Sequence, residues 1–263
     1  MLKLLAAIAA LSSDSPAPLE PTTKWSIDYA EEQCFLSRTF GTGTDQIILG
    51  FGVLPGAVND QIFLIESGRD AGGTRRISAV FDLGSGLEPV EASGLGIARK
   101  EGGRITRLGA AAAEVERFRT AGQVVISADG QRYHLRLSGT QAAFAAADAC
   151  KSDLMQEWGL DPKLVTDVKT RAQPARDPVT WLSPNDYPRE AMIAGERGQA
   201  VARLDIGADG AVTGCAIVQS SGADSLDKVT CTLLRKRARF HPARDAAGKP
   251  VPSIWVQRFR WST

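Results

Sequence analysis

The chain has 263 residues, of which 43% are hydrophobic and 23% are charged, and its formal net charge at pH 7 is +1. This size and hydrophobic content fit one or two domains with a buried core. The near-neutral charge gives no indication of binding to nucleic acid or to an anionic membrane. Its two histidines, His134 and His241, lie far apart in the sequence. A metal centre built from several histidines is therefore excluded, and no cofactor is expected.

Residues 1–17 have the pattern of a short signal peptide. Lys3 precedes an apolar run from Leu4 to Leu11, and small and polar residues follow up to Ala17. This order is typical of export signals. A membrane-spanning helix needs about 20 apolar residues, which is more than this run provides. An alanine-rich cytoplasmic helix is the alternative interpretation.

Residues 25–159 are expected to form a first domain made mainly of strands. Runs of β-branched and aromatic residues bounded by turn residues predict strands at 34–40, 46–53, 61–66 and 74–81. Good helix formers predict a short helix over 110–120. A hairpin is predicted over 123–137, where Asp-Gly joins two alternating runs, and a helix over 140–158 ends the domain. The sequence indicates no role for this domain.

Residues 160–180 are expected to be a linker. This stretch contains Pro162, Pro174 and Pro178 together with several charges, and its apolar residues follow no period. Such a composition is typical of a connection between domains.

Residues 181–263 combine turn, periodicity and end signals in the order helix, hairpin, helix, strand. Pro188 and Gly195 mark the ends of a short helix. Alternating residues on either side of Asp209-Gly210 predict the hairpin. The predicted segments are residues 188–194, 199–206, 211–219, 226–237 and 253–261.

This order, with the motifs inside it, resembles the C-terminal domain of the TonB family, the periplasmic energy transducers of Gram-negative envelopes. The resemblance covers roughly the last third of the chain. It implies an α+β domain, with two helices on one face of a three-stranded antiparallel sheet. The resemblance also implies a periplasmic protein, and the predicted export signal, if cleaved, would leave it soluble or peripherally attached to a membrane. The residues that carry the resemblance are Tyr187, Pro188, Gly198, Gly210, Ser221, Gly222, Leu226, Phe240 and Pro242.

The final strand is the segment to which the resemblance assigns a function. In TonB-like domains the corresponding strand accepts the TonB box of an outer-membrane receptor as an additional strand. A strand that comes last in a three-stranded sheet is expected at an edge, where one row of backbone groups is unpaired. We therefore expect a non-enzymatic protein that binds receptors in transport across the envelope. The expected partner-binding residues are Ile254, Trp255, Val256, Gln257, Arg258, Phe259 and Arg260.

An envelope structural or scaffolding protein is the alternative, in which the same edge forms a homodimer or pairs with another partner. The alternation along the strand does not settle which of its faces is buried. Trp255 and Phe259 fall on one face, Ile254 and Val256 on the other, so both faces include apolar residues.

The four cysteines fit an exported protein with disulfides. They form no C-x-x-C motif, which makes zinc and thioredoxin-like redox sites weak hypotheses. Three pairings are open, and the simplest joins Cys34 to Cys150 and Cys215 to Cys231, one pair within each domain. Four free buried thiols in a reducing compartment are the alternative.

Two short motifs have both a chemical and an ordinary interpretation. Ser225 and Lys228 fit the S-x-x-K pattern of penicillin-binding enzymes, but the partner motifs of those enzymes are missing, so Ser225 is expected to cap the helix that begins at Leu226. The densest basic run is either a solvated helix end or a contact for an anionic envelope polymer such as peptidoglycan, and nucleic acid is not expected. It consists of Arg235, Lys236, Arg237 and Arg239.

Overall fold

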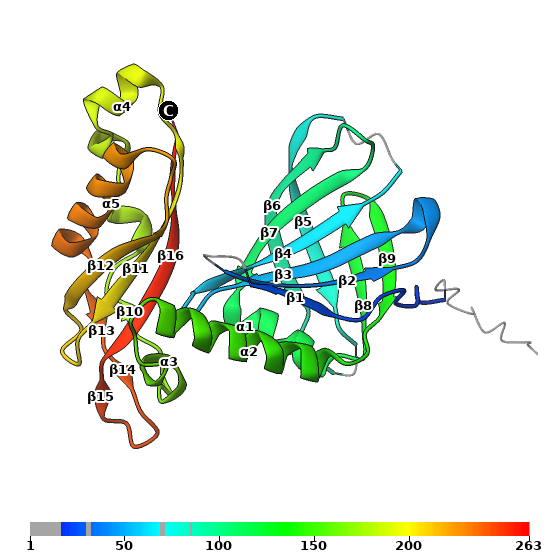
Figure 1. The fold of residues 1–263 in the computed structure, drawn as a ribbon, viewed down its shortest axis with the longest axis horizontal. Helices are drawn as coiled ribbons and strands as arrows, with labels where there is room; N and C mark the ends of the chain where they lie inside the picture. Colours follow the sequence, from blue (N-terminus) through cyan, green and yellow to red (C-terminus); the bar gives the residue numbers. More distant parts are fainter. Residues whose placement is uncertain (1–16, 30–32, 69–71, 85, 263) are drawn as a thin grey trace, which may run out of the picture.

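The structure is a computed structural model that describes residues 17–29, 33–68, 72–84 and 86–262. All of the predicted signal peptide except Ala17 lies outside these residues. The fold is a mixture of strands and helices arranged as two bodies, which we call the N-terminal body (17–159) and the C-terminal body (181–262) (Figure 1). Within the described part of the chain, no helix is both long and apolar enough to cross a membrane.

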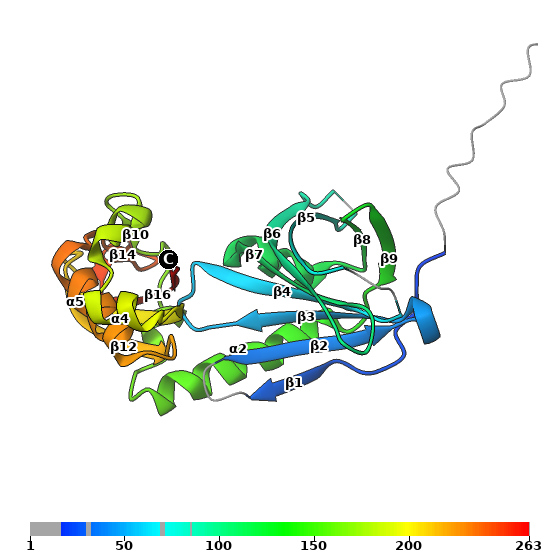
Figure 2. The same cartoon turned by 90° about the horizontal axis from the view of Figure 1, so that it is seen from above.

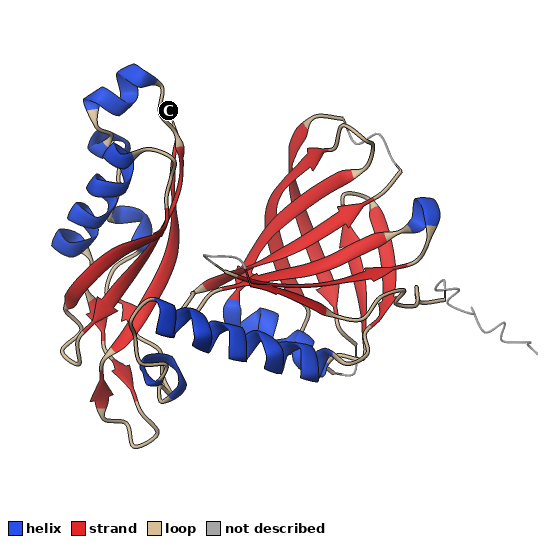
Figure 3. Ribbon diagram, in the orientation of Figure 1, coloured by secondary structure: helices blue, strands red, loops and turns tan. Residues whose placement is uncertain are grey.

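The N-terminal body is built on one curved antiparallel sheet of nine strands (Figure 3). Their order across the sheet is β1-β2-β3-β4-β7-β6-β5-β8-β9. Residues 19–22 lie between the two ends of the sheet, because Leu19 pairs with β9 and Pro21 bridges to β2. The strands are β1 Ser26–Tyr29, β2 Cys34–Phe40, β3 Ile47–Val53, β4 Asn59–Glu66, β5 Thr74–Asp82, β6 Val90–Ala98, β7 Arg104–Ala111, β8 Gln123–Ala128 and β9 Gln131–Arg136.

Aromatic side chains fill the space inside this curved sheet. Phe51 of β3 lies at the centre, with its ring 4.9 Å from that of Phe118 and 5.4 Å from that of Phe144. Phe144 belongs to α2 (Thr140–Glu157), the long helix that runs beside the sheet (Figure 2). Because α2 is also joined to β2 by a disulfide between Cys34 and Cys150, helix and sheet form one unit.

The predicted strands of this body are present, but β1, β6 and β7 were not predicted. In β6, Gly94 and Gly96 weaken the strand signal, because glycine has low strand propensity. The fold requires Gly94, since a Cβ atom there would lie 1.9 Å from the carbonyl oxygen of Arg107. The predicted helix over 110–120 is shorter than expected, because β7 extends to Ala111. It consists of α1 (Ala112–Val115) and the 3₁₀ helix η2 (Glu116–Thr120).

Residues 160–180, expected to be a linker, are folded onto both bodies, and we call them the junction segment. They contain α3 (Lys163–Thr166), β10 (Gln173–Pro174) and the 3₁₀ helix η3 (Pro178–Thr180). Directly after them, Trp181 is 2% exposed and packs against the rings of Phe240 and Trp255. The sequence does not indicate this packing, because the apolar residues of the junction segment follow neither a helical nor a strand period.

The C-terminal body contains the predicted order of helix, hairpin, helix and strand. Its main sheet has three strands in the order β12-β11-β16. Helix α5 packs on one face of this sheet, and α4 packs against the start of α5 (Figure 1). The elements are the 3₁₀ helix η4 Pro184–Asp186, α4 Arg189–Ala194, β11 Gly198–Ile206, β12 Val212–Gln219, α5 Asp224–Arg237, β13 Phe240–His241, β14 Ala243–Arg244, β15 Pro250–Val251 and β16 Ser253–Trp261.

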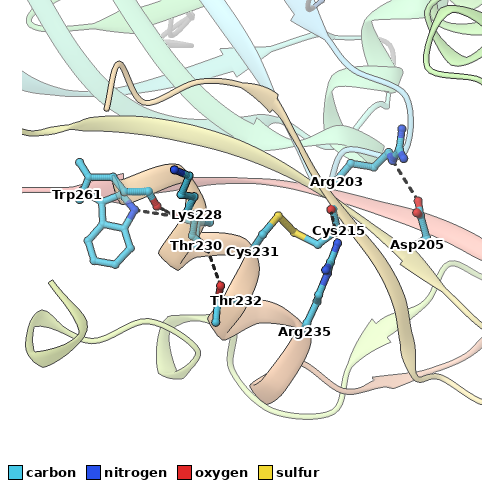
Figure 4. Close-up of a disulfide and its surroundings, with 10 residues drawn as sticks. Arg203, Asp205, Cys215, Lys228, Thr230, Cys231, Thr232, Arg235 and Trp261 are labelled. Atoms are coloured by element: carbon cyan, nitrogen blue, oxygen red, sulfur yellow. Dashed lines mark hydrogen bonds and ion pairs between the residues drawn. A yellow bond between two sulfur atoms is a disulfide. The ribbon is translucent and has the colours of Figure 1, made fainter. Parts of the chain in front are cut away.

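Both disulfides join the cysteines that the simplest pairing predicts. Cys34 and Cys150 have Cα atoms 6.0 Å apart, and Cys215 and Cys231 have theirs 5.6 Å apart. The second pair holds α5 on β12 (Figure 4). The pairing of cysteines within each body is thus confirmed.

Candidate functional site

Strand β16 lies where the two bodies meet, and both of its faces are buried. It pairs with β11 over its whole length, without a shift in register. Trp255 and Phe259 belong to the apolar cluster under α5. Ile254 and Val256 point the other way, into a cluster with Met155 of α2. The sequence could not settle which face is buried because both of them are.

The outer edge of β16, expected to be unpaired, is already occupied at Val256 by the N-terminal body. The backbone N–H of Val256 donates to the carbonyl oxygen of Gly56 at 3.1 Å, and the N–H of Val58 donates to the carbonyl oxygen of Val256 at 3.3 Å. Ala57 thereby forms a parallel bridge with Val256. Part of the expected partner-binding stretch is therefore paired within the same chain. Because some 200 residues separate the two segments, no local pattern could have indicated this contact.

Side chains hold the Gly56–Val58 segment in place. Arg258 donates to the carbonyl oxygen of Asn59 at 3.2 Å, and Arg171 of the junction segment donates to that of Ala57 at 2.7 Å. Gly56 has a φ of +68°, and a Cβ atom at this position would lie 2.7 Å from Cγ1 of Ile254. Only glycine combines this backbone conformation with such close contact.

Beyond Val256 the outer edge of β16 is open. In an antiparallel strand, backbone N–H and C=O groups of successive residues point alternately to the two sides. Because Val256 directs its groups outward, Arg258 and Arg260 direct theirs outward as well. In the described residues, these outward groups have no hydrogen-bond partner. The unpaired edge is thus shorter than expected and consists of the second half of β16.

A groove of about 680 Å³ runs along this open edge, and we call it the edge groove. Phe259 of β16 forms one wall of it. Leu182 and Tyr187, which follow the junction segment, also line it. An unpaired strand edge beside an apolar groove can accept an extended segment, whose backbone pairs with the strand while its side chains enter the groove.

Residues of the predicted family motif stabilise this end of β16. The ring of Tyr187 meets that of Trp261 edge-on at 5.4 Å, and its hydroxyl donates to the carbonyl oxygen of Glu196. Leu226 is fully buried beside Trp261. The indole N–H of Trp261 donates to Oγ1 of Thr230 in α5 at 2.9 Å. These contacts connect the last strand to α5 and to the residues that flank α4.

A comparison with protein-family models matches residues 183–263 to the C-terminal domain of the Gram-negative bacterial TonB protein. Residues 183–263 are a TonB C-terminal domain. The resemblance inferred from the sequence is thus confirmed for this part of the chain. The match does not include the N-terminal body or the junction segment, and no curated protein matches the chain.

The basic run of the TonB C-terminal domain is largely engaged in internal contacts. Arg235 donates to the carbonyl oxygen of Cys215 at 2.9 Å (Figure 4). Arg237 forms a two-pronged ion pair with Asp186, with N–O distances of 2.6 and 2.7 Å. This guanidinium lowers the pKa of the Asp186 carboxyl well below its usual range. These contacts favour a structural role for the run, and binding of an anionic polymer stays a prediction.

The S-x-x-K motif forms no catalytic arrangement in the TonB C-terminal domain. Oγ of Ser225 donates to the carboxylate of Glu196 at 2.6 Å. The prediction that Ser225 caps α5 is wrong, because the helix begins one residue earlier, at Asp224, and Ala223 occupies the cap position. Among the described residues, no group of His, Cys, Asp and Glu side chains could hold a metal ion.

Asp60 is the buried carboxylate closest to the contact between β16 and the N-terminal body. It is 8% exposed, and its Oδ1 has no hydrogen-bond partner. Burial raises the pKa of Asp60 to about 6, against the attraction of Lys151, Arg258 and Arg171. The same burial lowers the pKa of Arg258. Burial thus removes part of the water that would hydrate the charged forms of Asp60 and Arg258.

Proposed function

We propose that this protein is a periplasmic TonB-family protein that binds an extended segment of an outer-membrane receptor and takes part in transport across the envelope. The segment adds as a further strand to the open half of β16. The observation that carries this proposal is the set of outward backbone groups of Arg258 and Arg260 beside the edge groove. The match of residues 183–263 to the TonB C-terminal domain supports the same reading.

The position of the N-terminal body limits the site to a short stretch. The docked Gly56–Val58 segment forms hydrogen bonds with the outward backbone N–H and C=O of Val256. Of the seven expected residues, those available for pairing are therefore Arg258 and Arg260, with Gln257 and Phe259 contributing side chains to the edge groove. Few backbone hydrogen bonds can form, so we expect modest affinity, with side chains in the groove supplying much of it.

The test is an NMR titration of the whole exported chain, isotope-labelled, with TonB-box peptides from the outer-membrane receptors of the same bacterium. We expect saturable amide shifts from Gln257 to Ser262. Peptides N-methylated at alternate residues provide a control that leaves the protein unchanged. Methylation of the residues that face β16 should abolish the shifts, and methylation of the other residues should preserve them, because only one set donates to the strand.

A second test uses two variants at one position. Arg260→Pro removes an outward N–H that β11 does not use, whereas Arg260→Ala keeps it. Loss of binding in the proline variant, with only a partial weakening in the alanine variant, which lacks the guanidinium but keeps the N–H, supports strand addition. Equal loss in both variants, or equal effects of the two methylation patterns, contradicts it.

A self-association role for this edge is the second candidate, and the short open stretch also permits it. A dimer would show a concentration-dependent sedimentation coefficient that Arg260→Pro lowers to the value of a monomer. The hydrogen bonds between Val256 and the Gly56–Val58 segment argue against a long antiparallel pair of strands from two copies, because the middle of β16 is already paired.

A further inference from the structure

A second cavity adjoins the open half of β16, on the face opposite to the edge groove. It has a volume of about 580 Å³ and lies between β16 and the strands β4, β6 and β7 of the N-terminal body. Of these two cavities, Trp255 and Phe259 line only the edge groove, whereas Arg258 and Arg260 line both. The alternation along the strand places the side chains of the two arginines on the face opposite to those of Trp255 and Phe259. The two cavities therefore share the edge of β16 and lie on its two sides.

Arginine side chains gather around this second cavity, which we call the arginine cleft. Arg258 and Arg260 come from β16, Arg197 directly precedes β11, and Arg107 comes from β7 of the N-terminal body. Among the described residues, none of the four forms a salt bridge. Arg107 lies over the ring of Phe63, 5.3 Å from its centroid, and Arg258 donates to neutral oxygens of Asn59 and Gln33.

The cleft contains little negative charge to balance these four cations. Asp60 is the one acidic residue among its lining residues, and it is 8% exposed. Burial lowers the pKa of Arg258; the negative charge of Asp60 opposes this shift, and the positive charge of Arg107 adds to it. Like charges gathered around one cavity favour the binding of an anionic group that balances them. There is space beside Gly109, one of the lining residues, because a Cβ atom there would meet no atom closer than 4.0 Å.

An extended segment that pairs with Arg258 and Arg260 must use both cavities. Successive side chains of a strand point to opposite faces of the sheet. One set enters the edge groove, where Leu182, Tyr187 and Phe259 are apolar. The other set enters the arginine cleft.

The geometry points to a bound segment that alternates apolar with acidic side chains, of which the acidic ones bind in a cleft that the N-terminal body completes with Arg107. This inference rests on the proposed strand addition, and it assigns a role to the part of the chain outside the TonB C-terminal domain. The partner is accordingly an acidic, extended peptide segment.

The test measures binding of three peptides of equal length to the whole exported chain by fluorescence anisotropy. Apolar residues alternate with Glu in the first peptide, with Gln in the second and with Lys in the third. We expect the Glu peptide to bind about tenfold more tightly than the Gln peptide at low salt, and the Lys peptide to bind most weakly. The difference should shrink as the salt concentration rises, because ions screen exposed charges.

Variants of the cleft then locate the effect. Arg107→Gln and Arg197→Gln should each weaken the Glu peptide by about threefold to tenfold and leave the Gln peptide unchanged. Arg132→Gln is the matched control, since Arg132 is an exposed arginine of β9 that does not line the cleft. Equal thermal midpoints for the three variants show that each is folded.

The outcomes separate this inference from the proposed function. If the Glu and Gln peptides bind equally, with shifts in β16, strand addition stands and the acidic specificity is overturned. If Arg107→Gln behaves like Arg132→Gln while Arg197→Gln weakens the Glu peptide, the role of the N-terminal body is overturned. If none of the three peptides binds at any salt concentration, this inference is overturned. The proposed function fails with it when the receptor peptides also cause no shifts in β16.

Discussion

The backbone N–H of Val256 donates a hydrogen bond to the carbonyl oxygen of Gly56, 3.1 Å away in the N-terminal body. Val256 lies in the middle of the strand to which a receptor segment is proposed to add. The N-terminal body and such a segment therefore compete for the same backbone groups at this residue. The length of strand open to a partner depends on whether the Gly56–Val58 segment stays docked.

Replacing Gly56 by valine should release this segment from β16. The new side chain would meet Ile254, and a φ of +68° is unfavourable for a β-branched residue. We expect the stability of the whole chain to fall by about 1 to 3 kcal/mol and the amide of Val256 to exchange its hydrogen faster. Gly43→Val is the control, because Gly43 has a similar φ of +62° and a Cβ there meets nothing within 4 Å. Unchanged exchange at Val256 in Gly56→Val would contradict the docking described above.

The buried Asp60 should make stability depend on pH between about 4 and 6. Its pKa in the folded protein is about 6, above the value of about 3.9 for an unfolded chain. Because the pKa is raised in the folded protein, the stability that Asp60 contributes is fully present below about pH 4 and is lost as the pH rises through 6. Asp60→Asn should therefore be more stable than the natural protein by about 3 kcal/mol at pH 8 and nearly equal to it at pH 4.

Urea unfolding of Asp60→Asn at several pH values measures this effect. Asp153→Asn serves as the control, because Asp153 is exposed on α2, whereas Asp60 is buried. A gain in stability that is the same at pH 4 and pH 8 would show that titration of Asp60 is not its cause.

The two disulfides should contribute unequally to stability. They close loops with sequence separations of 116 and 16 residues. In the chain-entropy model, the longer loop contributes about 4 to 5 kcal/mol and the shorter about 3 kcal/mol. Replacing Cys34 and Cys150 by serine should therefore lower the urea midpoint more than replacing Cys215 and Cys231. A larger effect from the second pair would mean that strain or residual structure outweighs loop closure.

Trp181 should contribute strongly to the stability of the C-terminal body, although the sequence predicts a linker directly before it. Its ring packs on Phe240 and Trp255 at 5.4 and 5.3 Å. Trp181→Ala should cost about 3 to 5 kcal/mol, because it leaves a cavity in the core. Val179→Ala, two residues earlier and 74% exposed, should change stability by less than about 0.5 kcal/mol. Similar losses in the two variants, measured by chemical unfolding, would contradict this packing.

Features that depend on local periodicity could be predicted from the sequence. The separation of Trp255 and Phe259 from Ile254 and Val256 follows from the period of a strand, and the structure places the two pairs in different apolar clusters. The hairpin at Asp129-Gly130 is equally local, and the structure has β8 and β9 on either side of it. Each of these predictions needs only residues that are neighbours in the sequence.

Features that depend on distant segments could not be predicted. Gly94 weakens the signal of β6, although its lack of a side chain is what allows β7 to approach. The pairing of Gly56 with Val256 joins segments with no shared motif. The arginine cleft also depends on distant segments, since Arg107 and Arg260 line the same cavity only because the two bodies dock. An open edge was therefore expected on the strand that has one, whereas the length of this edge and the arginine cleft beside it depend on tertiary structure.

The docked Gly56–Val58 segment also affects solubility. An open sheet edge invites pairing with other chains, and many proteins protect such edges with charges, prolines or a covering segment. Excision of residues 183–263 would uncover the middle of β16 together with the apolar side chains of Ile254 and Val256. The isolated domain should thus aggregate at concentrations at which the whole chain remains dispersed, and the N-terminal body protects it from doing so.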